Sequence, residues 1–166
     1  MVMIPNPGKD HLLIQGCRPI TLSNIVNKLA EKLVAKHLQN TQYLFHHLQY
    51  GSRGGRSALD AMMILMSEAE RARNKGQHVT ILGEDIVSAF NNVRTKECVV
   101  QIAKVDTDIA VYVERFLTRR TFTMQWDGRD REQVSIDQRF PQGSPLSPVL
   151  WLIYLLPVLK RTQGRF

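Results

Sequence analysis

The chain has 166 residues, 43% of them hydrophobic, which fits one folded domain with a buried core and excludes a wholly disordered protein. Its formal net charge is +7, and the excess of cations lies in residues 1–76, with ten Lys or Arg against five Asp or Glu. A basic half suits a polyanionic partner such as nucleic acid, although a solvated basic surface is an equal alternative. Two cysteines, Cys17 and Cys98, are too few for a disulfide framework or a zinc site, so we expect both in the core of an intracellular protein.

No segment predicts a targeting signal or a membrane span. Residues 1–6 lack both the basic start and the apolar stretch of a secretory signal. The apolar run Val149–Leu159 has about half of the roughly 20 residues that a span requires, and Pro157 interrupts it. We therefore expect a soluble protein without a membrane partner, and we expect the sequence to be truncated at one or both ends.

The first part of the chain predicts turns and then a helix. Ile4–Asp10 is rich in turn-forming residues, and a short extended piece is expected over Leu12–Gln15. Ser23 can cap a helix from Asn24 to Gln39. Apolar residues at helical spacing predict its buried stripe, which has the members Ile25, Leu29, Leu33, Val34 and Leu38.

A second helix is predicted after a glycine-rich turn over residues 51–56. Ser57 can cap it, and Gly76 follows its end, as glycine often does. The expected buried stripe of this helix is Leu59, Met62, Met63 and Met66. The next segment, His78–Ile86, is short and rich in β-branched residues, which predicts a buried strand.

Two shorter helices are predicted after that strand. Thr95 can cap a helix over Lys96–Ala103. Asp106 or Thr107 can cap another over Asp108–Arg119.

The last part of the chain predicts a hairpin and a buried helix. Phe122–Trp126 and Gln133–Ile136 read as two strands joined by a turn at Asp127-Gly128. Val149–Leu159 is expected to be a buried helix that Pro157 kinks or ends. Because helices interleave with a few strands, the predicted fold class is α+β.

Asp85 is the strongest catalytic candidate, because it ends the predicted strand and precedes Ile86-Val87-Ser88-Ala89-Phe90. Transfer of a nucleotide to a 3′-hydroxyl depends on positioning and on charge neutralisation by two Mg²⁺ ions roughly 3.5–4 Å apart. A carboxylate at a strand end can bridge both ions, and the Ile86 carbonyl could supply another oxygen ligand. Taken alone, an aspartate after a strand is more often a turn residue.

Residues 141–148, which run Pro-Gln-Gly-Ser-Pro-Leu-Ser-Pro, are the most specific string in the chain. Gly143 permits close backbone approach, and Gln142 can donate or accept a hydrogen bond near a nucleotide or a template base. A Pro/Gly/Ser cluster is ordinarily only a loop. The pairing of this string with Asp85 favours a functional site, and we expect the carboxylate and the Gln142–Gly143 bend to share one cleft.

Residues 85–93 and residues 141–148, in this order, resemble reverse transcriptases of the non-LTR retrotransposon kind. Two earlier strings resemble the same family, Arg18-Pro19-Ile20-Thr21-Leu22 and residues 49–58. The second acidic cluster of that family, Tyr-x-Asp-Asp, does not occur before Phe166. The sequence therefore resembles an incomplete polymerase.

The resemblance assigns roles around an incoming deoxynucleotide. It makes Phe90 an aromatic gate against a ribose 2′-hydroxyl, with a core phenylalanine as the alternative. It places Arg18 on the triphosphate, whose oxygens suit a guanidinium, with an exposed cation as the alternative. Members of the family usually carry Lys where this chain has Asn6, and Lys9 could partly substitute.

The same resemblance places residues 49–58 against the template strand. Arg53, Arg56 and the backbone at Ser57, where the second helix starts, together offer a phosphate site. A P-loop is excluded, because the glycine-rich turn is one residue short and carries Arg56 where Lys is required.

For the whole chain, the resemblance implies fingers over residues 1–76 and a partial palm over residues 77–166, with helices packed on a small antiparallel sheet. It implies RNA-templated DNA synthesis from deoxynucleoside triphosphates on a DNA primer, with Mg²⁺ or Mn²⁺. The expected location is intracellular, in the nucleus or the cytoplasm, and the resemblance favours the nucleus. One aspartate cannot complete the octahedral shells of two Mg²⁺ ions, so we expect little or no polymerisation by these residues alone. A non-catalytic nucleic-acid-binding remnant is the alternative, and a decayed gene product is a third.

Overall fold

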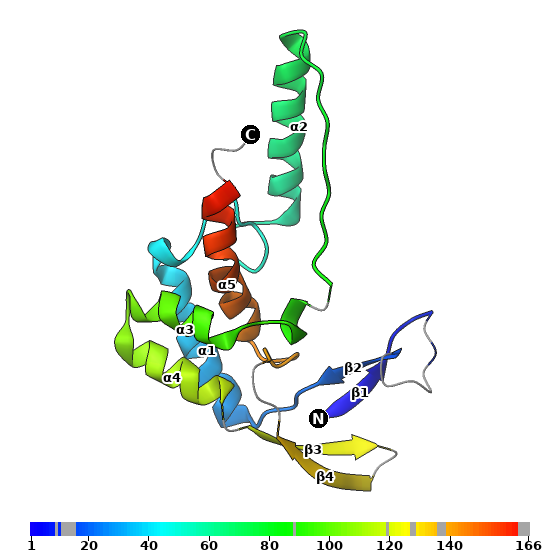
Figure 1. Cartoon of the computed structure of the whole chain (residues 1–166), viewed down its shortest axis with the longest axis vertical. Helices are drawn as coiled ribbons and strands as arrows, with labels where there is room; N and C mark the ends of the chain where they lie inside the picture. The colour runs from blue at the N-terminus through cyan, green and yellow to red at the C-terminus, as the bar shows by residue number, and fades with distance from the viewer. Residues whose placement is uncertain are drawn as a thin grey trace.

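The computed structural model describes residues 1–8, 10, 16–87, 89–118, 120–126, 129–135 and 139–162. Helices dominate, and a small sheet lies at one end (Figure 1). The strands are β1 (Val2–Pro5), β2 (Cys17–Ile20), β3 (Thr121–Trp126) and β4 (Arg129–Ser135). The helices are α1 (Ile25–Asn40), α2 (Ala58–Asn74), α3 (Thr95–Ala103), α4 (Thr107–Leu117) and α5 (Ser147–Thr162), with the short 3₁₀ helices η2 (Gln42–Leu44) and η3 (Ala89–Asn91). The α+β class agrees with the prediction.

The sheet has the strand order β2-β1-β3-β4 and is mixed, not purely antiparallel. β1 pairs antiparallel with β2, where Val2 lies opposite Ile20, and β3 pairs antiparallel with β4 as the predicted hairpin. β1 joins β3 in parallel through Val2 and Gln125, where the expected antiparallel pattern fails. Pro19 lacks an N–H for the ladder, and β2 accommodates it because this strand lies at the sheet edge. The expected extended piece Leu12–Gln15 lies outside the described residues.

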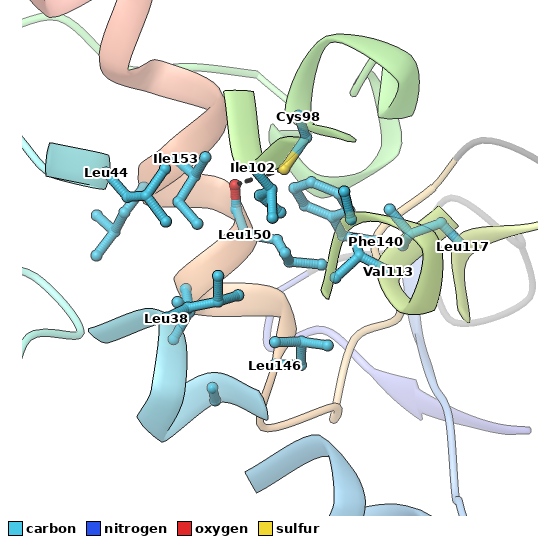
Figure 2. Close-up of a cluster of buried hydrophobic side chains, with 14 of the residues drawn as sticks. Leu38, Leu44, Cys98, Ile102, Val113, Leu117, Phe140, Leu146, Leu150 and Ile153 are labelled. Atoms are coloured by element: carbon cyan, nitrogen blue, oxygen red, sulfur yellow. Dashed lines mark hydrogen bonds between the residues drawn. The ribbon is translucent and has the colours of Figure 1, made fainter. Parts of the chain in front are cut away.

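The hydrophobic core lies among α1, α3, α4 and α5. Figure 2 shows their side chains in one cluster, among them Leu38, Ile102, Val113 and Ile153. Cys98 belongs to this cluster, and its Sγ donates a hydrogen bond to the Leu150 carbonyl oxygen at 3.5 Å. Both Cys17 and Cys98 are buried and neither forms a disulfide, which confirms their predicted place in the core.

The buried face of α1 differs from the predicted stripe. Asn24 caps the helix in place of Ser23, because its side-chain oxygen accepts a hydrogen bond from the Asn27 N–H at 2.8 Å. The buried residues of the helix are Glu31, Ala35 and Leu38, which spacings of four and three residues place on one face. The predicted stripe is wrong at three exposed members, Ile25, Leu29 and Leu33.

α2 forms as predicted, but none of its residues is buried. A capping box starts the helix: the Ser57 hydroxyl accepts from the Asp60 N–H, and the Asp60 carboxylate accepts from the Ser57 N–H at 2.7 Å. Hydrogen bonds from the hydroxyl and the N–H of Ser57 lower the pKa of Asp60. The predicted stripe is exposed along its length, at Leu59, Met62, Met63 and Met66.

The predicted buried strand His78–Ile86 is wrong. Residues 77–86 form neither helix nor strand, all of them are exposed, and Leu82 is 78% exposed. A strand needs a neighbour for its N–H and C=O groups, and none of β1 to β4 pairs with this segment. Figure 1 shows the segment leading from the far end of α2 back to η3. We call residues 58–87, none of which is buried, the exposed arm.

The remaining helices agree with the prediction except at their ends. α3 begins at Thr95 itself, and Arg94 before it makes no side-chain cap, so the predicted Thr95 cap is wrong. Asp106 caps α4 by accepting from the Ile109 N–H at 3.0 Å, as predicted. α5 continues past Pro157 and ends at Thr162, so Pro157 does not end the helix. Among the described helices, none has the length and apolar character needed to cross a bilayer.

Candidate functional site

The Gln142–Gly143 bend is tied by hydrogen bonds to distant parts of the chain. The Thr21 N–H donates to the Gln142 carbonyl oxygen at 2.8 Å, which joins the bend to the segment after β2. The buried Ser147 hydroxyl donates to the Pro141 carbonyl oxygen at 2.8 Å, which joins it to the start of α5. Since the backbone is held on both sides, the Gln142 side chain projects from a fixed position.

Gly143 is required by the geometry of this bend. Its φ is +96°, a conformation that L-residues with a side chain rarely adopt. A Cβ added here would lie 2.9 Å from the Thr21 carbonyl oxygen and 3.1 Å from Ile20 Cγ2. The close approach predicted for this glycine is therefore met by the chain's own backbone. Its predicted role against a nucleotide stays a prediction.

A buried carboxylate holds the residue that follows the bend. Glu31 on α1 is 3% exposed and accepts a hydrogen bond from the Ser144 hydroxyl at 2.5 Å. The Ser144 oxygen in turn accepts from the Leu146 N–H at 3.1 Å. Sequence reasoning missed Glu31. Its spacing from Leu38, a correctly predicted core residue seven positions later, was the available signal.

Asp85 does not meet the bend in this structure. Its side chain is exposed, and its Oδ1 accepts a hydrogen bond from the Ile86 N–H at 2.9 Å, as a turn aspartate does. It lines neither of the two cavities beside the bend, so the expectation of a shared cleft is wrong here. The physical reason is the unpaired segment 77–86, which was expected to fix Asp85 at a strand end.

Phe90 lies close to the bend, because it packs against the residues before and after it. Its ring meets Phe140 and Trp151 edge to face, with centroid separations of 6.3 Å and 5.9 Å. Its carbonyl oxygen accepts from the Phe140 N–H at 3.0 Å. These contacts belong to a residue packed against the core, the alternative weighed above, and the gate role stays a prediction.

A small cavity of about 40 Å³ brings three predicted strings together. Pro19 and Thr21 line it from the Arg18–Leu22 string, Asn91 from residues 85–93, and Gln142 from the bend. This volume is too small to enclose a nucleotide. Asn91 had not been singled out from the sequence, although it stands within the string that carries Asp85.

Of the two residues predicted to bind the triphosphate, the structure describes Arg18 but not Lys9. Arg18 is exposed on the edge strand β2, where it lies opposite Ile4. Lys9 lies outside the described residues. Asn6, at the position where the resemblance leads us to expect Lys, is anchored by its N–H, which donates to the Gly16 carbonyl oxygen at 2.8 Å.

The glycine-rich turn is braced by its two arginines. Arg53 donates to the His46 carbonyl oxygen at 3.1 Å and lies 5.1 Å from the centre of the Phe45 ring. Burial, followed by the neighbouring charge of Arg56, lowers the pKa of Arg53. Arg56 donates to the Gln49 carbonyl oxygen at 3.3 Å. Each guanidinium has five N–H donors, so donors remain for a phosphate.

No group of three or more His, Cys, Asp or Glu side chains gathers at metal-binding distance within the described ranges. Two Mg²⁺ ions with near-octahedral shells need more oxygen ligands than Asp85 and the Ile86 carbonyl can offer. The described residues therefore do not fit a complete two-metal centre.

Comparisons with known proteins bear on the whole chain. A family model described as reverse transcriptase (RNA-dependent DNA polymerase) matches residues 4–166. The probable RNA-directed DNA polymerase from transposon X-element of Drosophila melanogaster is 25% identical over 158 residues, covering 92% of this chain. The RNA-directed DNA polymerase from mobile element jockey of Drosophila funebris is 23% identical over 93% of this chain.

A third relative is the retrovirus-related Pol polyprotein from type-1 retrotransposable element R2 of Popillia japonica, 27% identical over 98% of this chain. All of these relatives are much longer. The chain spans 17% of the length of the X-element and jockey proteins and 23% of the R2 protein.

Proposed function

Since the chain belongs to the reverse transcriptase family, we propose that it forms the fingers and part of the palm of a polymerase that synthesises DNA on an RNA template. The proposed fingers are residues 1–76 and the proposed partial palm is residues 77–166. The bend at Gln142–Gly143 carries this proposal, because Thr21 from the proposed fingers hydrogen-bonds to it and Asn91 from the proposed palm lines the same small cavity as Gln142. A nuclear location is proposed from the family resemblance.

The proposed ligand at this bend is a deoxynucleoside triphosphate. Gln142 and Gly143 would lie against the base or ribose, and Phe90 would restrict the 2′ position. Arg18, three residues before the Thr21 contact, would bind the triphosphate together with Lys9. The support is that the Thr21 hydrogen bond fixes the end of β2 to the bend, and Arg18 lies on that strand.

The proposed template and primer contact is the turn before α2. Arg53 and Arg56 stay partly exposed while their contacts with backbone carbonyls and rings hold the turn in shape. Ser57 caps α2, and a helix N-terminus favours an anion. A pre-shaped turn with spare cationic donors suits a phosphate backbone.

Asp85 and the Ile86 carbonyl are the proposed metal ligands, for Mg²⁺ or Mn²⁺. When bound, such ions neutralise charge during nucleotidyl transfer. Because the described residues do not complete a two-metal centre, we expect no primer extension by these 166 residues alone.

Primer extension tests the polymerase proposal. A longer polypeptide, in which this sequence is followed by the matching downstream region of the X-element relative, should extend a DNA primer on an RNA template. Asp85→Asn in that polypeptide should reduce extension to background, while Asp108→Asn, an exposed aspartate at the start of α4, should leave it unchanged. Extension by the 166-residue chain itself would contradict the need for further carboxylates.

Binding without catalysis is the second candidate, and the exposed, unclustered Asp85 favours it. The chain should bind an RNA–DNA template–primer duplex, with affinity falling steeply as salt rises. Arg53→Ala combined with Arg56→Ala should lower the slope of log affinity against log salt by roughly one to two. A chain that binds no duplex at any salt concentration would refute both candidates.

A further inference from the structure

Glu31 is a buried carboxylate to which the proposed function gives no role. It lies on α1 and is 3% exposed, on a buried face that it shares with Ala35 and Leu38. Glutamate is rarely buried this completely unless it is paired, because removing its charge from water costs free energy. A hydrophobic residue would suit this face, and replacing a buried charge by one often leaves stability unchanged. Stability of the core therefore does not explain a carboxylate here.

The carboxylate of Glu31 contacts the residue that follows the bend. The buried Ser144 hydroxyl donates to Glu31 Oε2 at 2.5 Å. A hydrogen bond to an ionised acceptor is roughly twice as strong as one between neutral groups. Ser144 extends this constraint along the chain, because its oxygen accepts from the Leu146 N–H at 3.1 Å, just before α5 begins.

Residues 17–40, which form β2 and α1, contact the bend region at three consecutive residues. The Thr21 N–H donates to the Gln142 carbonyl oxygen, and the Thr21 carbonyl oxygen would lie 2.9 Å from a Cβ added at Gly143. Glu31 holds the third residue, Ser144. A bend attached at Thr21 alone could turn about that point, whereas a second attachment at Glu31 fixes its direction as well.

Two other roles for Glu31 have less support in the structure. A metal ligand would need companions, and no three His, Cys, Asp or Glu side chains gather at binding distance among the residues that the structure describes. A counter-ion for Arg120 would need close contact, and no ion pair joins the two. Burial lowers the pKa of Arg120 to about 10, against a smaller upward effect of the Glu31 charge.

We propose that Glu31 is a positioning residue, which fixes through Ser144 the direction in which the Gln142–Gly143 bend faces a nucleotide. The inference rests on the proposed function, because the bend is the proposed contact of the incoming deoxynucleotide. In this role Glu31 acts through Ser144 and makes no contact with the ligand. Removing its acceptor should release the bend and leave the core closed, whereas a residue needed only for stability would loosen every part together.

Hydrogen exchange at single backbone amides, followed by NMR on the full chain, tests this role. Glu31→Leu is similar in size and has no acceptor for the Ser144 hydroxyl. Exchange should rise at the Thr21 and Leu146 amides by at least about tenfold more than at the Ile102 amide in α3. Glu31→Gln keeps an acceptor, so exchange at all three amides should stay within about threefold of wild type.

Ala35→Gly is the matched control, because it weakens the same buried face of α1 without touching Ser144. It should raise exchange at all three amides by a similar factor. If Glu31→Leu does the same, Glu31 serves only stability and the inference fails.

Ser144→Ala removes the same contact from the other side, so it keeps the test decisive if Glu31→Leu does not fold. The Thr21 amide is the informative one in this variant, since Ser144 itself is the acceptor for Leu146. Exchange at Thr21 should again rise more than exchange at Ile102. A Thr21 amide that stays protected in Ser144→Ala would overturn the inference.

Nucleotide kinetics separate this inference from the proposed function. In the longer polypeptide described above for primer extension, Glu31→Leu should raise KM for deoxynucleoside triphosphates by about tenfold, with a smaller change in kcat, and Glu31→Gln should restore most of the loss. If wild type extends a primer and Glu31→Leu leaves KM unchanged, this inference alone fails. If wild type extends no primer, the proposed function fails, and selective exchange at Thr21 would still show that Glu31 holds the bend.

Discussion

The bend has no room for a side chain at Gly143. Alanine there would combine an unfavourable φ of +96° with a Cβ 2.9 Å from the Thr21 carbonyl oxygen. Because hydrogen bonds hold both backbones in place, Gly143→Ala should lower the free energy of unfolding by about 2–4 kcal/mol. Urea unfolding followed by circular dichroism measures this loss.

Gly54→Ala is the matched control. A Cβ at Gly54 meets no atom within 4 Å, and its φ lies outside the left-handed region. Its effect should be below about 0.5 kcal/mol. Equal effects of the two substitutions would show that the contact with Thr21 does not constrain the bend.

Cys98 provides a test of the core. Burial raises the pKa of its thiol to about 12, and the thiolate is the form that reacts. Native chain should therefore resist iodoacetamide at Cys98 near neutral pH, whereas urea-unfolded chain should react there, as mass spectrometry of the alkylated peptides would show. Rapid labelling of Cys98 in the native chain would indicate that α3 opens from the core.

Site residues were predicted where they belong to a recognisable sequence motif. They were missed where only a long-range contact marks them. Gln142 and Gly143 stood out because residues 141–148 resemble a motif of the reverse transcriptase family, whereas a Pro/Gly/Ser cluster alone is ordinarily a loop. Glu31 and Asn91 did not stand out, because a glutamate in a helix and an asparagine after a turn are ordinary residues until the fold brings them to the bend. Long-range contacts of this kind carry no local signal.

At the scale of helices, Asp106 links α4 to α1. Its carboxylate caps α4 and accepts a hydrogen bond from His37 Nε2 at 2.9 Å. The hydrogen bond from the Ile109 N–H, together with the smaller effects of the His37 hydrogen bond and charge, lowers the pKa of Asp106 below its ordinary value. This carboxylate therefore stabilises the fold above the pKa of an unfolded aspartate, about 3.9, and that contribution is lost as pH falls through the lower folded value.

Asp106→Asn isolates this contribution, because an amide oxygen can still cap the helix. The variant should be less stable than wild type above the pKa of an unfolded aspartate, about 3.9, and the difference should disappear as pH falls through the lower folded pKa. Thermal unfolding across this pH range measures it. A difference that stays constant at every pH would mean that the charge of Asp106 adds nothing. Asp108→Asn, exposed in the same turn, is the control for a general change of charge.

Helices were predictable here because capping and periodicity are local. α1, α2 and α4 and the β3–β4 hairpin follow from residues within a few positions of one another. The buried faces of α1 and α2 were not predictable in the same way, since a face is buried only where another element covers it. The predicted strand at residues 78–86 failed for the same reason, because pairing requires a second strand.

For the molecule as a whole, the exposed arm is an apolar surface without a cover. Met63 is 61% exposed, Leu82 is 78% exposed and Val87 is 80% exposed. Large apolar patches and unpaired strand-like segments promote association. The purified chain should therefore form larger species as its concentration rises, measured by sedimentation velocity.

The double substitution Met63→Lys with Leu82→Lys should reduce that association and leave thermal unfolding nearly unchanged, because neither side chain belongs to the core. Lys32→Ala with Lys36→Ala, two exposed positions on α1, controls for general surface changes and should not reduce it. Wild-type chain that stays monomeric at high concentration would contradict this role of the arm.

Because Asp85 lies on the exposed arm, the proposed binding of a divalent ion there would be coupled to any ordering of the backbone around it. A single carboxylate on a segment without helix or strand holds a divalent ion only weakly. A ligand that binds the ordered form of such a segment stabilises that form by mass action. Divalent-ion titration would thus report the backbone order of the arm, and we expect the proposed binding at Asp85 to be weak in this sequence by itself.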